Sequence, residues 1–229
     1  MPDPLTALRR RLRQAARLRL APVRRIGRAQ YGEDRVALHF LGHRRGGFYA
    51  DFGAHHPVRL SNTWLLHAAY GWRGLNVDAD AELMQAFRRL RPRDINVTAA
   101  IGPGKAPVEF TVFEKRLEST LDPARAARTG RRREVIARHS LVPRTIAEIF
   151  EAHLPPDQAI DFMSVDLEGA DLDALGTNDW ARFRPELVCV EDFGFRALEP
   201  TPIRGFMEDR GYRWVSHAVY SSFYLRDGA

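Results

Sequence analysis

Short apolar runs alternate with helix-like patterns from about residue 46 to the end of the chain. The runs have the length of strands, and the segments between them have the spacing of amphipathic helices. We predict strands at 48–52, 75–78, 95–101, 108–113, 135–142, 160–165, 187–190, 212–215 and 222–225, and helices at 59–70, 83–90, 146–153 and 203–209. This alternation predicts an α/β fold with a mainly parallel sheet, helices on both faces and an antiparallel hairpin at the C-terminus.

The alternation is interrupted by a polar, arginine-rich stretch at 114–133. Such a stretch does not suit a core, so we expect an excursion or lid at about 114–140. After it, Thr145 and Glu148 form a capping box that opens the next helix. With 229 residues in the chain, we predict one domain at 31–229 that carries this excursion.

An N-terminal arm at 1–30 carries most of the charge. Nine arginines and one acidic residue, Asp3, give it a net charge of +8, whereas the whole chain carries +6. The rest therefore sums to −2, and a specific nucleic-acid surface is not expected. Leucines and arginines on opposite sides of the arm predict a basic amphipathic helix. Such a helix can lie on an anionic membrane surface or pack against its own domain or a partner subunit.

The composition also bears on the compartment. The single cysteine, Cys189, excludes an intramolecular disulfide framework. No apolar run reaches the ~20 residues of a membrane-spanning helix. The N-terminus lacks the uninterrupted apolar stretch of a secretory signal. We therefore expect a cytoplasmic protein, with residues 1–28 available for peripheral contact with the inner face of the membrane.

Acidic residues follow several of the predicted strands. Asp51 and Gly53 close the first strand, and Asp78 closes the second. Asp166 and the pair Glu191–Asp192 follow two later strands. In open α/β sheets, ligands bind beyond the carboxyl ends of the strands, so we expect these side chains at one edge of the sheet.

The first two strand ends indicate a cofactor that contains a ribose. Asp78 lies 27 residues after Asp51, where a carboxylate can accept hydrogen bonds from both ribose hydroxyls. The phosphate-binding motif G-x-G-x-x-G is absent, and Asp51 suits an ammonium group better than a phosphate. S-adenosylmethionine meets both conditions, because it has a ribose and an amino-acid tail but no phosphate. A tight turn at Gly53 that binds nothing is the structural alternative.

The same strand ends belong to a longer set of motifs. In chain order these are Asp51-Phe52-Gly53-Ala54, Ser61-Asn62-Thr63, Gly71-Trp72-Arg73-Gly74, Ala100-Ile101-Gly102, Ser119-Thr120, Ile160-Asp161-Phe162, Asp166-Leu167-Glu168-Gly169, Phe183-Arg184-Pro185 and Glu191-Asp192. Together they resemble the FkbM family of S-adenosylmethionine-dependent methyltransferases over residues 46–192. The Asp-x-Glu-Gly segment is the most specific motif, and Pro57 is a departure, because many members have glycine there.

The resemblance implies a fold, a reaction and a set of cofactor contacts. The fold is the class I methyltransferase (Rossmann-like) fold with a mainly parallel seven-stranded sheet. The reaction is methyl transfer to oxygen, often on sugars of polysaccharides, glycolipids or natural products. The implied cofactor residues are Asp51, Gly53, Ala54 and His55 for the methionine part, Ser61 or Asn62 for its carboxylate, Asp78 for the ribose, and Ala99 and Ala100 for the adenine.

The acceptor hydroxyl needs a base or a metal to become a nucleophile at neutral pH. Asp166, Glu191 and Asp192 offer the oxygen ligands that Mg²⁺ or Mn²⁺ takes. Their order resembles the Mg²⁺ site of macrolide-sugar O-methyltransferases, which have a histidine base where this chain has Gly169. The structural alternative for Asp192 is a helix cap.

The base must therefore be another residue. The candidates are Glu168, His56, His139 and His217, of which we favour Glu168 and His217 as catalytic residues. The alternatives are a helix cap for Glu168 and a packing or surface role for each histidine.

The favoured function is S-adenosylmethionine-dependent O-methylation of a carbohydrate or small-molecule hydroxyl acceptor. One alternative is RNA methylation, although the chain has only Lys105 and Lys115 for a mechanism that uses lysines. The other is a non-catalytic binding protein on the same fold, which the acids at both expected positions argue against. The sequence defines neither the acceptor nor the oligomeric state.

Overall fold

The computed structural model describes residues 27–194 and 200–229. The predicted arm at 1–30 lies almost entirely outside these residues, and so does its expected membrane contact. Within the described ranges, no helix combines the length and the hydropathy needed to cross a bilayer.

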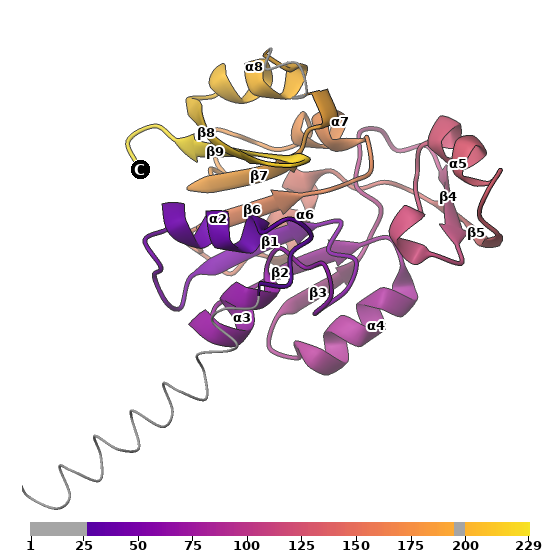
Figure 1. Ribbon diagram of the computed structural model, residues 1–229, viewed down its shortest axis with the longest axis horizontal. Coiled ribbons are helices and arrows are strands. Elements are labelled where there is room, and N and C mark those ends of the chain that lie inside the picture. Colours follow the sequence, from indigo (N-terminus) through magenta and orange to yellow (C-terminus); the bar gives the residue numbers. More distant parts are fainter. Residues whose placement is uncertain (1–26, 195–199) are drawn as a thin grey trace, which may run out of the picture.

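A seven-stranded sheet forms the centre of the domain (Figure 1). In spatial order its strands are β3 (Ile95–Thr98), β2 (Arg73–Asp78), β1 (Phe48–Phe52), β6 (Phe162–Val165), β7 (Leu187–Glu191), β9 (Ser221–Arg226) and β8 (Tyr212–Ala218). The first five run parallel, and β9 pairs antiparallel with β7 and β8. This confirms the predicted sheet and its C-terminal hairpin. The strand order reverses between β1 and β6, the switch point at which such sheets bind ligands.

Helices cover both faces of the sheet, as the alternation predicts. One core contains residues of α6 (Ile146–His153), α7 (Asp171–Leu175) and α8 (Pro202–Glu208), and the other contains residues of α2 (Glu33–Phe40) and α3 (Trp64–Tyr70). α4 (Ala81–Leu90) contacts β2 and β3. Successive residues of β1 pack into opposite cores. Phe48, Ala50 and Phe52 belong to the first core, and Tyr49 belongs to the second.

The chain between β3 and α6 contains a small sheet of its own. β4 (Val108–Phe113) and β5 (Val135–Leu141) pair with each other in a separate two-stranded antiparallel sheet, and we call residues 108–141 the excursion. Between them lie the 3₁₀ helix η1 (Arg116–Glu118) and α5 (Pro123–Thr129). Figure 1 shows this unit beside the central sheet, near α4.

Two predicted boundaries near the carboxyl edge of the sheet are wrong. The helix predicted from residue 59 begins at Trp64, because the Ser61 hydroxyl accepts hydrogen bonds from the amides of Thr63 (3.3 Å) and Trp64 (3.1 Å) and Leu60 has a φ of 57°. A left-handed residue and a competing side chain exclude an earlier start. The strand predicted to reach residue 101 ends at Thr98, so the following residues form a loop.

Gly53 lets the ends of β1 and β6 approach each other. Its φ is 78°, and a Cβ atom at this position would lie 1.8 Å from the backbone oxygen of Asp166. The amide of Asp166 also donates to the carbonyl of Phe52 at 3.0 Å. Glycine is therefore required here both by its backbone conformation and by the close approach of the neighbouring strand end.

We expect Gly53→Ala to lower the free energy of unfolding by roughly 2–4 kcal/mol, because it adds a steric clash to the strain of a left-handed alanine. The matched control is Gly104→Ala, since Gly104 has a φ of 85° and a Cβ atom added there would meet no atom within 4 Å. The control should cost only about 1 kcal/mol. Urea denaturation measures both, and equal losses would contradict the close approach at Gly53.

Candidate active site

A cleft opens at the carboxyl ends of the parallel strands, between the central sheet and the excursion. The ends of β1, β2 and β3 contribute Gly53, His55, Asp78, Ala99 and Ala100, the segment after β6 contributes Asp166 and Glu168, and the excursion contributes Phe110, Arg116, Leu117, Thr120 and Leu121. Five of the nine predicted cofactor residues therefore line one cleft, together with two of the predicted acids.

Asp78 ties two loops of the cleft together. Its Oδ2 atom accepts a hydrogen bond from the amide of His55 at 2.8 Å, and its Oδ1 atom accepts one from the amide of Asp80 at 2.8 Å. Burial raises the pKa of Asp78 to about 6. Each oxygen retains another lone pair for a ligand donor. The carboxyl group thus lies in the cleft, at the end of β2.

The loop after β1 presents a neutral side chain to the cleft. His55 has a φ of 50°, and burial, followed by repulsion from His56, lowers the pKa of His55 to about 4. Ala54 is buried and packs against α4 instead of lining the cleft. The predicted methionine-binding segment therefore contributes Gly53 and an uncharged imidazole at neutral pH.

Three other predicted cofactor residues belong to an internal hydrogen-bond network. The Thr63 hydroxyl donates to Asp51 Oδ2 at 2.8 Å, and a buried guanidinium donates to Ser61 Oγ at 2.8 Å. Asn62 Nδ2 donates to a serine hydroxyl of β6 at 3.0 Å. Asp51 and Ser61 are buried, so they support the loop after β1 and are absent from the lining of the cleft.

That guanidinium belongs to Arg91, which is fully buried. Nε and Nη2 of Arg91 donate to the carbonyl oxygen of Pro57 at 2.9 and 2.5 Å, and Nη1 donates to Thr63 Oγ1 at 2.8 Å. Nη1 also lies 3.2 Å from the Tyr49 hydroxyl and 3.3 Å from Asn76 Oδ1. The sequence did not reveal this role, because an arginine that follows an amphipathic helix is normally exposed.

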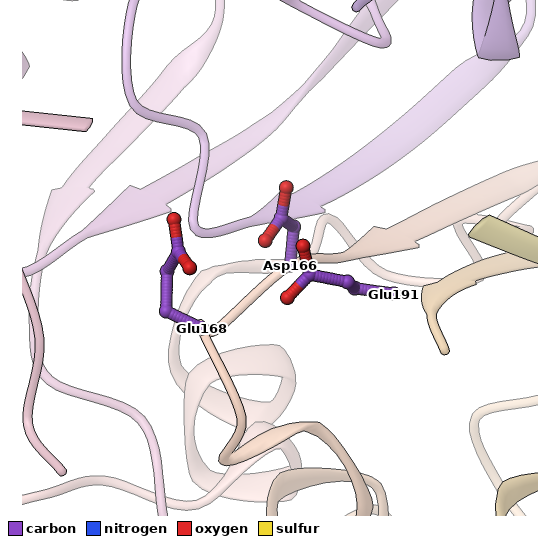
Figure 2. A group of neighbouring side chains, drawn as sticks. All are labelled: Asp166, Glu168 and Glu191. Atoms are coloured by element: carbon purple, nitrogen blue, oxygen red, sulfur yellow. The ribbon is translucent and has the colours of Figure 1, made fainter. Parts of the chain in front are cut away.

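Three carboxylates meet at the ends of β6 and β7. One oxygen each from Asp166, Glu168 and Glu191 lies within 4.8 Å of the others, and Figure 2 shows the three side chains with their carboxylates close together. Asp166 follows β6, Glu191 ends β7, and Glu168 has a left-handed backbone with a φ of 57°. We call these three residues the acid cluster.

The acid cluster has little positive charge to balance it. Arg125 of α5 forms an ion pair with Glu168. Glu191 Oε2 is buried without a hydrogen-bond partner in the described part of the chain. Burial, followed by repulsion from Asp166, raises the pKa of Glu191 to about 9. Burial and neighbouring carboxylates also raise the pKa of Asp166, so the pair retains a proton at neutral pH.

Asp192 and His217 lie outside this cluster. Asp192 is buried and accepts hydrogen bonds from the Thr201 hydroxyl at 2.7 Å and the amide of Gly194 at 3.3 Å, so it anchors the start of α8. His217 of β8 contacts Ser222 Oγ at 3.0 Å and does not line the cleft. The geometry thus places Glu168, in place of Asp192, beside Asp166 and Glu191.

The strand order, with the cleft at the switch point, is that of a Rossmann-like methyltransferase. The family model described as the methyltransferase FkbM domain matches residues 51–214, and the chain belongs to this family. The comparison with curated proteins found no match. The resemblance and the fold class that we predicted are therefore confirmed, and family membership identifies a methyltransferase and indicates S-adenosylmethionine as its cofactor.

We expect the metal-free protein to lose stability as the pH rises from about 5 to about 9. In the unfolded chain the carboxyl group of Glu191 titrates near 4.5, whereas the folded protein retains the proton up to about 9. Between these values the folded state binds more protons, so its stability falls with rising pH.

Glu191→Gln should flatten this dependence and raise the melting temperature at pH 9 by several degrees, as measured by differential scanning fluorimetry across the pH range. Glu109→Gln, at an exposed position of β4, serves as the control and should leave the slope unchanged. A wild-type slope equal to that of Glu191→Gln would show that Glu191 ionises normally.

Proposed function

We propose that the protein transfers the methyl group of S-adenosylmethionine to a hydroxyl group, namely that of a sugar in a polysaccharide, glycolipid or glycosylated natural product. The observation that carries the proposal is the position of Asp78 in a cleft that also contains Gly53, Ala99 and Ala100. The cleft thus has a carboxylate that can accept hydrogen bonds from ribose hydroxyls, and small residues lie beside it. Its lining contains no glycine-rich phosphate-binding loop.

The residues of the cleft divide into a cofactor side and an acceptor side. Asp78 accepts the ribose hydroxyls, and Ala99 and Ala100 leave room for a flat base that Leu117 and Leu121 of the excursion cover. S-adenosylmethionine supplies an electrophilic methyl carbon, so the protein needs to align the acceptor and remove its proton. The acid cluster borders this side of the cleft through Asp166 and Glu168.

We assign the general base to the pair Asp166 and Glu191. A base works best when its pKa lies near the working pH, and both of these pKa values are raised. Glu168, one of the two catalytic residues expected from the sequence, is engaged in an ion pair with Arg125, so we do not assign the base to it. His217, the other, lies outside the cleft lining. Asp166 lines the cleft and is the group that would accept the hydroxyl proton.

A divalent cation is the alternative way to balance the acid cluster: bound there, it would hold Asp166 and Glu191 ionised and would itself lower the pKa of the acceptor hydroxyl, so these two residues would then be metal ligands and not the base. Oxygens within 4.8 Å of one another can share one hard cation, whose bonds to oxygen are about 2.0–2.6 Å long. The unpartnered oxygen of Glu191 also suits a metal ligand. Mg²⁺ or Mn²⁺ would be held by Asp166, Glu168 and Glu191, with no part for Asp192.

We expect Asp78→Ala to weaken binding of S-adenosylhomocysteine by roughly 10- to 100-fold, because hydrogen bonds from the ribose to a carboxylate are lost. Isothermal titration calorimetry measures the affinity, and circular dichroism reports whether the fold is retained. Asp209→Ala, at the exposed end of α8, is the matched control and should bind as the wild type does. Unchanged affinity in the folded Asp78→Ala variant would refute the ribose assignment.

Magnesium chloride should raise the melting temperature of the wild-type protein at neutral pH, because a ligand that binds only the folded state stabilises it. Glu191→Gln should abolish this shift, whereas Glu109→Gln should retain it. If Mg²⁺ and Mn²⁺ leave the wild-type melting temperature unchanged, Asp166 and Glu191 are balanced by a shared proton and bind no cation.

A further inference from the structure

Three aromatic side chains gather at the edge of the sheet where β7 ends. Tyr31 and Phe193 are 41% and 46% exposed, and Tyr220 lies half-buried between them. The ring centroids of Tyr31 and Tyr220 are 5.2 Å apart with an interplanar angle of 81°, and those of Phe193 and Tyr220 are 5.3 Å apart at 50°. We call these three residues the aromatic trio.

The backbone connects the aromatic trio with the strand end that carries Glu191. Phe193 follows Glu191 by two residues, and the intervening amide of Asp192 donates to the carbonyl oxygen of Tyr220 at 2.6 Å. Ser221, next to Tyr220, stands opposite Glu191 in the pairing of β9 with β7. The rings from the β7 end and from the β8–β9 turn are therefore held against each other where the strand that carries Glu191 ends.

Tyr31 reaches the same edge through its neighbour Glu33. The amide of Tyr31 donates to Glu33 Oε2 at 2.8 Å, and the Ser221 hydroxyl donates to Glu33 Oε1 at 3.4 Å. Three segments far apart in the sequence thus bring aromatic rings and carboxylates to one place.

Exposed aromatic rings near half-buried acids match the surface of a sugar ring. One face of a pyranose presents C–H groups that pack on an aromatic ring, whereas its hydroxyl groups donate hydrogen bonds to carboxylates. Ligand sites in general combine apolar and aromatic walls with a few polar groups that fix the orientation, and exposed apolar patches mark binding surfaces.

We propose that the aromatic trio is a binding subsite for a pyranose ring of the acceptor, next to the hydroxyl that the acid cluster deprotonates. The subsite rests on the proposed function for its place in the reaction, but its binding of sugar can be measured without turnover. Continuity with the acid cluster favours a sugar ring over a lipid surface, because sugar hydroxyls donate hydrogen bonds to carboxylates whereas anionic lipid headgroups are repelled by them.

Saturation-transfer difference NMR with the methyl glycosides of glucose, galactose, mannose and rhamnose tests the subsite in the presence of S-adenosylhomocysteine. We expect C–H protons of at least one glycoside to receive saturation from the wild-type protein. Phe193→Leu, which keeps the apolar volume but removes the ring, should weaken that binding roughly three- to tenfold. Phe193→Tyr should retain it, as should Leu90→Ala, at a 53% exposed leucine of α4.

The outcomes separate the subsite from the proposed function. Calorimetry on the same variants should give unchanged affinity for S-adenosylhomocysteine. If the wild type fails to bind S-adenosylhomocysteine but binds a glycoside through Phe193, the proposed function fails and the subsite stands. Absence of glycoside binding, or equal binding by Phe193→Leu, overturns the subsite. Loss of binding to phosphatidylglycerol vesicles in Phe193→Leu, with unchanged glycoside signals, would also overturn it by assigning the surface to lipid.

Discussion

The loop that follows β1 and lines one side of the cleft depends on the buried guanidinium of Arg91. Removing a cation from water is costly unless its N–H groups find acceptors and its charge finds a counter-charge. The carbonyl of Pro57 and the hydroxyls of Ser61 and Thr63 accept its hydrogen bonds, and the carboxyl group of Asp51, joined through Thr63, lies within the range of its charge. Because the three hydrogen-bond acceptors lie on the segment that follows β1, the network specifies one conformation for the loop that lines the cleft with Gly53 and His55.

The excursion brings positive charge to two acidic places at the cleft. Arg125 of α5 pairs with Glu168, and Arg116 pairs with Asp80, the residue that caps α4. The first contact balances part of the acid cluster, and the second anchors the excursion close to Asp78. The same segment therefore covers the cleft and adjusts its electrostatics. This explains why a polar, arginine-rich stretch that contributes little to the core belongs to the site.

Backbone periodicity predicted the parts of the site that depend on where parallel strands end. Gly53, Asp78 and Asp166 meet in the cleft for that reason. Side-chain direction accounts for the rest. Consecutive strand residues point to opposite faces, so Glu191 joins the acid cluster whereas Asp192 anchors α8. Glu168 belongs to the acid cluster and has a left-handed backbone. The sequence does not predict this conformation, because glutamate seldom adopts it. His217 lies on β8, an edge strand that β9 separates from β7. The separation of His217 from Glu191 therefore follows from the strand order, which the sequence did not give.

The raised pKa values of Asp166 and Glu191 make their ionisation depend on what occupies the cleft. A positive charge near a carboxyl group favours the ionised form and lowers its pKa, whereas a neutral ligand that excludes water has the opposite effect. Under the proposed function, the methyl donor carries a sulfonium charge and its product form does not. A donor held near the pair would therefore favour its ionised form, the form that can accept the proton of the acceptor hydroxyl, and the uncharged product would favour that form less. The burial that raises both pKa values would thus make the ionisation of the pair respond to the charge of the cofactor.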